Sequence, residues 1–165
     1  MTSKAVDRLA DRWEAAWSEK EPAAFAAVCA ADLHYEDPLT EQPLEGAEAL
    51  ARHAQRLWGA FPDVRLERTG ARLSDGRFLA APAKLLGTHR GPLEGLPATN
   101  RFVVVHCIFY CELERTRMLR VRCFLDLYDA ATQLGVLPAR GTMGEKALLV
   151  LRGFGLRGRE RRSDA

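Results

Sequence analysis

The sequence predicts an α+β domain in which three N-terminal helices and a cone-shaped, curved antiparallel sheet enclose a pocket. Three observations predict this fold class: helical spacing of apolar residues before residue 61, long apolar runs of β type after residue 63, and turn signals between those runs. Helices followed by antiparallel strands favour helices on one face of the sheet. A long sheet covered by three helices must curve, and its concave side is a natural pocket for a small organic molecule.

Length and charge limit the classes of protein that are possible. The 165 residues are enough for one domain with a core and too few for two, and the net charge of +2 excludes nucleic-acid binding by charge alone. The sequence contains no apolar run suited to a membrane span, and its start lacks the apolar core of a signal peptide. We therefore expect a cytoplasmic protein without nucleic-acid or membrane partners. Its domain should span residues 1–151, followed by a basic, disordered tail at residues 152–165.

Three helices are predicted before residue 61. Apolar residues at helical spacing mark the first helix: Val6, Leu9, Trp13, Ala16 and Trp17. Pro22 suits the first turn of a second helix. Residues 33–38 should then be extended and end in a proline turn. Gly46 introduces a third helix at residues 47–60, which ends at Phe61-Pro62-Asp63.

The rest of the chain has mainly the pattern of a β-sheet. Apolar and β-branched residues dominate four runs, at residues 64–73, 78–88, 99–113 and 117–127. Polar turns at residues 74–77 and 114–116 separate consecutive runs, and a loop rich in Gly and Pro covers residues 91–97. Residues 128–134 should form one or two helical turns that end at Gly135, and residues 145–151 a short strand or helix.

The cysteines and histidines do not predict a metal site. Cys29, Cys107, Cys111 and Cys123 form no CxxC pair and lie in apolar segments, so we expect buried free thiols. The histidines form no HxxxH or HxH pair. We therefore expect no bound metal.

Several short strings resemble a known family. LGTHRG at residues 86–91 resembles a GTHxG signature, and GLPATNR at residues 95–101 resembles the GLPATGR that follows it. FLD at residues 124–126 and QLGVLP at residues 133–138 resemble an FD…QLGxxP ending. Together with YEDP at residues 35–38 and FPD at residues 61–63, these strings are similar to the SnoaL-like polyketide cyclase (ester cyclase) family. That family has the nuclear-transport-factor-2-like, ketosteroid-isomerase-like cone fold, and the resemblance covers roughly residues 6–138.

The resemblance implies a reaction and its setting. Founding members close the last ring of a polyketide ester in antibiotic biosynthesis, by intramolecular aldol condensation and without any cofactor. It also implies a small hydrophobic, polyketide-like substrate, and the fold implies a homodimer joined through the outer face of the sheet. Two alternatives stay open. The pocket could serve another cofactor-free reaction (isomerisation, dehydration or epoxide opening), or the protein could bind a small molecule without catalysis.

Three residues are candidates for acid/base catalysis. Asp126 matches the acid/base aspartate of the family and is the one carboxylate of an apolar strand, so it should have a raised pKa unless it pairs with Arg120 or Arg122. His106 could share protons with Asp126 or be a core histidine; the face of its strand is undetermined. Asp37 precedes a proline, as the general base of ketosteroid isomerases does, or it caps a turn.

Eight aromatic and histidine residues are candidates for substrate binding, because pockets of this kind are largely apolar and aromatic. They are Trp17, Tyr35, His53, Trp58, Phe61, His89, Tyr110 and Phe124. Each could instead belong to the core or to the edge of the sheet. Asn100 stands where the family usually has glycine, and we expect it to keep the turn because Asn tolerates a positive φ.

Overall fold

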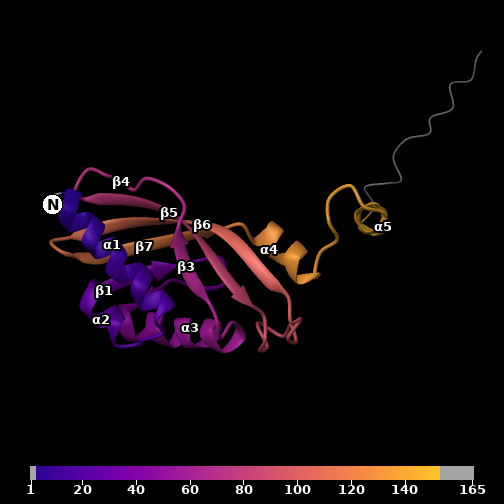
Figure 1. The fold of residues 1–165 in the computed structure, drawn as a ribbon, viewed down its shortest axis with the longest axis horizontal. Coiled ribbons are helices and arrows are strands. Elements are labelled where there is room, and N and C mark those ends of the chain that lie inside the picture. Colours follow the sequence, from indigo (N-terminus) through magenta and orange to yellow (C-terminus); the bar gives the residue numbers. More distant parts are fainter. Residues whose placement is uncertain (1–2, 153–165) are drawn as a thin grey trace, which may run out of the picture.

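Three helices cover one side of a curved sheet in the structure, a computed structural model that describes residues 3–152 (Figure 1). The helices are α1 (Ser3–Ser18), α2 (Ala24–Val28) and α3 (Gly46–Ala60). The strands are β1 (Cys29–Glu36), β2 (Leu44–Glu45), β3 (Arg65–Arg68), β4 (Leu73–Ser74), β5 (Phe78–Thr88), β6 (Phe102–Glu114) and β7 (Arg117–Leu125). Two further helices, α4 (Leu127–Leu134) and α5 (Met143–Leu151), follow the last strand. The predicted α+β class is confirmed.

The sheet is mixed rather than wholly antiparallel. Its strand order is β2-β1-β7-β6-β5-β3, with β4 also paired to β5. β1 runs parallel to β7, and every other pair in the described part of the chain is antiparallel. The predicted antiparallel sheet is therefore confirmed for every described pair except β1 with β7. A parallel pair needs a long crossover, and here the chain from α3 through β6 supplies it.

The predicted strand at residues 64–73 is interrupted between β3 and β4. Thr69 would continue the ladder opposite Pro82 of β5, and its N–H does donate to the Pro82 carbonyl at 3.2 Å. Pro82 has no N–H to give in return, so regular pairing stops there. β5 keeps the predicted bounds, residues 78–88.

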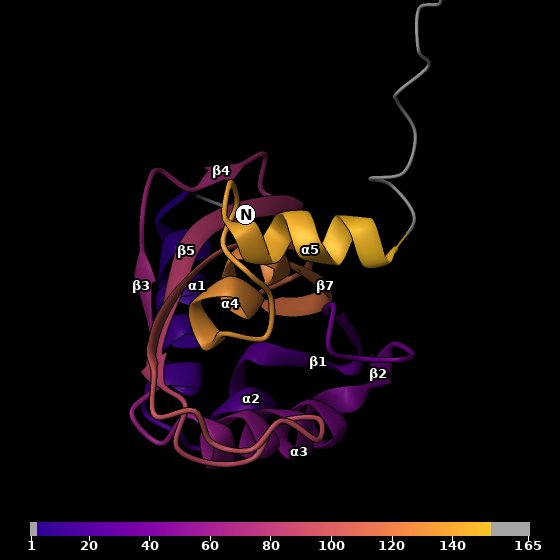
Figure 2. The ribbon, with the colours of Figure 1, turned by 90° about the vertical axis from the view of Figure 1, so that its right-hand side faces the viewer.

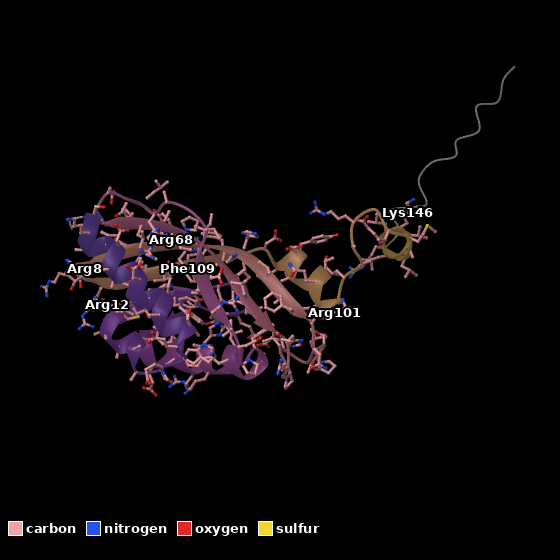
Figure 3. The ribbon with its side chains drawn as sticks, in the orientation of Figure 1. Arg8, Arg12, Arg68, Arg101, Phe109 and Lys146 are labelled. Carbon is pink, nitrogen blue, oxygen red and sulfur yellow. The ribbon has the colours of Figure 1, made fainter. Side chains whose placement is uncertain are left out.

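Alternation along β6 separates the two faces of the sheet. Val103, Val105, Cys107, Phe109 and Cys111 are buried on the concave face, while the residues between them point outward. Phe109 lies between the sheet and α1 (Figure 3). Trp13 of α1 meets its ring edge-on, with the ring centroids 5.7 Å apart. The core therefore lies between the concave face and the helices.

The final helix of the domain, α4, docks beside β6 where β7 has ended. The Gln133 side chain accepts from the Val104 N–H and donates to the Val104 carbonyl, each at 2.8 Å, as a neighbouring strand would. Asp126 caps the first turn of α4, and Gly135 ends it at φ 80°. In Figure 2, β5 arches above α4, β7 lies to its right, and α3 lies at the bottom of the view. The FLD…QLG strings thus have a structural role in closing one end of the cone.

The FPD and GTHRG strings hold a loop against α3. Asp63 accepts from the backbone and the hydroxyl of Thr88, at 2.6 and 2.7 Å. A Cβ on Gly91 would lie only 2.3 Å from the Gly59 carbonyl oxygen, so glycine is needed at this close approach. Asn100 adopts the expected positive φ, 56°.

Residues 143–151 form a helix, α5, rather than a strand. It stands apart from the cone, with Lys146 at the far end of the molecule (Figures 1 and 3). The predicted tail at residues 152–165 lies outside the described residues except for Arg152. In the described part of the chain, no helix combines the length and apolar character that crossing a membrane requires.

Replacement of Gln133 by Met should lower the free energy of unfolding by about 1–3 kcal/mol. Met is about as long as Gln but cannot bond to the Val104 N–H and carbonyl, so both backbone groups lose their partner. Chemical unfolding followed by tryptophan fluorescence measures the change. Thr132→Ala is the matched control, since the Thr132 hydroxyl bonds only within α4, and it should stay within about 0.5 kcal/mol. Equal stability of Gln133→Met and the wild type would contradict the role given to Gln133.

Candidate functional site

An apolar cavity of about 440 Å³ lies between the concave face of the sheet, α3 and α4. Leu57 of α3 and Phe61, which follows the helix, line one side. Leu85 and Val105 of the sheet line another, and Leu134 of α4 closes the end. Among the described residues that line it, Tyr128 is the only one with a polar side-chain atom. The cavity therefore suits a small and largely hydrophobic molecule.

A second, much smaller space of about 20 Å³ adjoins the cavity on the side of α1. The two spaces share Leu57, Leu85 and Leu125 as lining residues. Asp37 and Tyr35 line the smaller one. A carboxylate therefore lies at the inner end of an otherwise apolar cavity.

Asp37 is the only buried carboxylate in the part of the chain that the structure describes. Its Oδ2 accepts from the Tyr35 hydroxyl and from Nε2 of His53, both at 2.8 Å, and its Oδ1 accepts from the Leu39 N–H at 2.7 Å. The side chains of Asp37 and His53 are each 2% exposed. A carboxylate has about four acceptor positions, so three donors leave one position, on Oδ1, for a substrate atom.

The hydrogen bonds keep Asp37 ionised despite its burial. Burial alone would raise the pKa of this carboxyl, but the hydrogen bond from His53, followed by those from Tyr35 and Leu39, brings the pKa below its ordinary value. Burial raises the pKa of Tyr35 well above its usual range, and the nearby Cys123 and Asp37 add to this. Tyr35 is therefore a neutral donor to a charged carboxylate.

Sequence reasoning named Asp37, Tyr35 and His53 separately, and the structure brings them together. YEDP places Tyr35 and Asp37 two residues apart, and α3 carries His53 to the same point. Sequence reasoning missed Arg56, whose guanidinium lies 3.0 Å from Nδ1 of His53. The signal was present, because residues three apart on a helix are neighbours.

Asp126 and His106 lie elsewhere. Asp126 is exposed, and its carboxylate accepts from the Asp129 N–H as the cap of α4. The prediction that Asp126 belongs to the apolar strand is wrong, because β7 ends at Leu125 and the chain turns outward there. No ion pair joins it to the described arginines of β7; Arg122 pairs with Glu36 instead. His106 is exposed on the outer face, and together with Asp126 it borders a shallow hollow outside the cavity.

Comparison of the sequence with known protein families identifies the family. A model of the SnoaL-like polyketide cyclase family matches residues 7–134. The chain belongs to the SnoaL-like polyketide cyclase family. Among curated proteins, no sequence matches it.

Solved structures show the same fold for this SnoaL-like protein. TsrD from Streptomyces laurentii is 23% identical with a TM-score of 0.74, over 83% of this chain and 99% of its own. IdmH from Streptomyces antibioticus, described as a candidate polyketide cyclase, is 18% identical with a TM-score of 0.69, over 78% of this chain and 97% of its own. A Catenulispora acidiphila protein with a ketosteroid-isomerase-like fold, solved with trimethylamine, is 19% identical with a TM-score of 0.67, over 77% of this chain and 92% of its own.

The remaining candidate binding residues of this SnoaL-like protein divide into three groups. Phe61 lines the main cavity and Trp17 the inner space. Trp58 and His89 are buried beside them without lining either; the Trp58 Nε1–H donates to the Trp17 carbonyl at 3.0 Å. Tyr110 and Phe124 lie on the outer face, 46% and 53% exposed, because strand alternation points them away from the cavity.

All four cysteines are buried and free, as predicted. Cys107 and Cys123 line the inner space next to Asp37. Within residues 3–152, no group of three or more His, Cys, Asp or Glu side chains is arranged to hold a metal ion.

The lowered pKa of Asp37 should make the stability of the fold depend on pH. A carboxylate with a lower pKa in the folded chain stabilises the fold above its unfolded pKa, near 3.8, and this contribution is lost as the pH falls through the folded value. We expect Asp37→Asn to be less stable than the wild type at neutral pH, and the difference to be smaller at an acid pH below the folded pKa, which lies under 3.8, because Asp37 itself is protonated there. Urea unfolding at both pH values measures this.

The matched control is Glu36→Gln. Glu36 is adjacent in sequence, but its ion pair with Arg122 lies at the surface, so its loss should cost less than about 1 kcal/mol. A stability difference for Asp37→Asn that is the same at both pH values would contradict the assignment of a lowered pKa.

Proposed function

We propose that this SnoaL-like protein is a cofactor-independent enzyme of secondary metabolism, acting in the manner of the polyketide cyclases of antibiotic biosynthesis. It would close a ring in a polyketide-derived substrate by intramolecular aldol condensation. One observation carries this proposal: the apolar cavity ends at the only buried carboxylate of residues 3–152, and that carboxylate has a free acceptor position.

The chemistry begins with a proton transfer to Asp37. The carboxylate removes a proton from a carbon next to a carbonyl group of the substrate, which leaves an enolate. The enolate carbon attacks a second carbonyl of the same molecule, and one carbon–carbon bond forms. Asp37 then returns its proton to the resulting alkoxide, so no atom is gained or lost. The walls of the cavity contribute by holding the two ends of the substrate in reacting geometry.

Burial favours Asp37 over Asp126 as the base. Near Asp37 water is excluded, and its partners are fixed by hydrogen bonds, whereas Asp126 faces solvent and already caps α4. Asp126 nevertheless matches the acid/base aspartate of the family, and Leu125 and Leu127 on either side of it line the cavity. Asp126, with His106 beside the same hollow, is therefore the second candidate for proton transfer.

The same cavity would also serve an isomerase, a dehydratase or an epoxide hydrolase, since each can start from a buried carboxylate. A non-catalytic binding protein would need the apolar cavity and not the ionised Asp37. The charged carboxylate favours the enzyme, because it keeps one acceptor position free and because groups with a shifted pKa at the end of a cavity are typical of proton-transfer sites.

We further propose that the protein forms a homodimer through the outer face of the sheet. Phe102, Ile108, Tyr110 and Phe124 are each 46–53% exposed there. Charged side chains of both signs surround them, including Arg122 paired with Glu36 and Arg77 paired with Glu112. An apolar patch with both charges at its rim can match a second copy of itself.

Native mass spectrometry after incubation with extracts of the producing cells tests the reaction. We expect Asp37→Asn to retain unconverted ligand and to lose about a hundredfold or more in turnover, because it can no longer take a proton. Asp126→Asn keeps the helix cap, since Asn caps as well as Asp, and should convert the ligand nearly as the wild type does. If unconverted ligand accumulated only on Asp126→Asn, Asp126 would be the base. The same unchanged ligand on all three proteins would favour a binding protein.

Size-exclusion chromatography with light scattering tests the dimer. Ile108→Glu places a charge in the middle of the apolar patch and should yield monomers, while Gln55→Glu, on the exposed side of α3, should leave the dimer intact. A wild-type chain that is monomeric at micromolar concentration would overturn the proposal.

A further inference from the structure

Arg56 connects the surface of α3 to the buried carboxylate. Its side chain is 59% exposed, yet its Nη2 lies 3.0 Å from Nδ1 of His53, one turn earlier on the helix. A guanidinium has only donors, so Arg56 donates and Nδ1 must accept with its lone pair. The contact therefore determines which nitrogen of His53 carries hydrogen.

The other ring nitrogen of His53 faces Asp37. Because Nδ1 is an acceptor, the hydrogen of the neutral ring lies on Nε2, and Nε2 donates to Oδ2 of Asp37 at 2.8 Å. Arg56, His53 and Asp37 thus form a line of two hydrogen bonds from the surface to the inner end of the cavity.

The two ring nitrogens of His53 face groups of opposite charge. On the Nε2 side lie Asp37 and the neutral Tyr35, with the thiols of Cys107 and Cys123 further along the inner space. Asp37 accepts on this side, so it requires a hydrogen on Nε2. On the Nδ1 side lies Arg56, which also approaches Glu94 of the 91–97 loop at 3.5 Å. A second proton on His53 would have to break the Arg56 bond and place two cations side by side.

We infer that Arg56 is a positioning residue, which keeps Nδ1 of His53 unprotonated so that His53 serves Asp37 as a neutral donor. An imidazolium ring would pair with Asp37 as an ion and make the carboxylate a weaker base. A neutral ring orients Asp37 and leaves its negative charge for the proton of the substrate. This inference rests on the proposed function, in which Asp37 is the base.

Nitrogen NMR of histidine-labelled protein tests the inference without a substrate. Two-bond couplings from the ring protons report whether each ring nitrogen carries hydrogen, and comparison with His53→Asn assigns the signals among the four histidines. We expect the wild type at neutral pH to have hydrogen on Nε2 of His53 and not on Nδ1. Arg56→Met removes both the donor and the charge, and should show a proton on Nδ1 at the same pH.

Two further variants separate this effect from a general loss of charge. Arg56→Lys retains a cationic donor and should restore the wild-type pattern. Arg52→Met removes an arginine from the same helix whose Nη1 contacts only Glu48 at the surface, and it should leave His53 unchanged. The variants of Arg52 and Arg56 should keep the wild-type thermal midpoint within a few degrees, because both arginines are largely exposed.

An unprotonated Nδ1 in Arg56→Met, or the same change in Arg52→Met, would overturn the inference. Measurements of turnover distinguish a failure of this inference from a failure of the proposed function. With the substrate captured on Asp37→Asn, Arg56→Met should lose about tenfold in kcat toward the acid side of the pH profile, and Arg56→Lys should recover it. If the NMR pattern changes as expected but Asp37→Asn turns over normally, the positioning of His53 stands and the proposed role of Asp37 fails.

Discussion

The arrangement around Asp37 depends on compensating a negative charge in an apolar interior. An isolated carboxylate there would be protonated or would destabilise the fold. Three donors from three places in the chain, the Tyr35 hydroxyl, the His53 ring and the Leu39 backbone, make the charged form the stable one. The register of β1, the turn at Pro38 and the rotation of α3 must therefore agree with one another.

The closure of the cone has a different physical basis. β7 is shorter than β6 at the end where α4 docks, which leaves Val104 without a strand partner on the side of β7. The Gln133 amide takes that place, and the turn at Asp126 aims α4 across the opening. The cavity exists because a helix, rather than another strand, completes this edge of the sheet.

The fold was predictable from the sequence because its signals are local. Helical periodicity in α1 and α3 and alternation in β5 and β6 determine the layers, and the bounds of β5 were predicted to the residue. The parallel pairing of β1 with β7 and the interruption at Pro82 depend on contacts distant in sequence, and local patterns do not contain them.

The candidate site was only partly predictable, for the same reason. A motif names Asp37 and Asp126 equally well, but which of them is buried depends on where β7 ends. His106 and Tyr110 share a strand face that alternation identifies, while only the position of the helices decides that this face is the outer one. Arg56 belongs to no motif, and its importance follows from the side chain that lies one turn before it.

The almost wholly apolar lining of the cavity has a consequence for selectivity. A wall of Leu, Val, Ala and Phe side chains offers few polar groups that a wrong ligand would leave unpaired. Discrimination between analogues that differ by one methylene group then reaches only about 10- to 200-fold. Such a chamber would tolerate varied ring systems and side branches, provided that each can bring an acidic C–H bond to its polar end. Evolution could then give the same scaffold a new substrate by exchanging a few wall residues while the polar end stays unchanged.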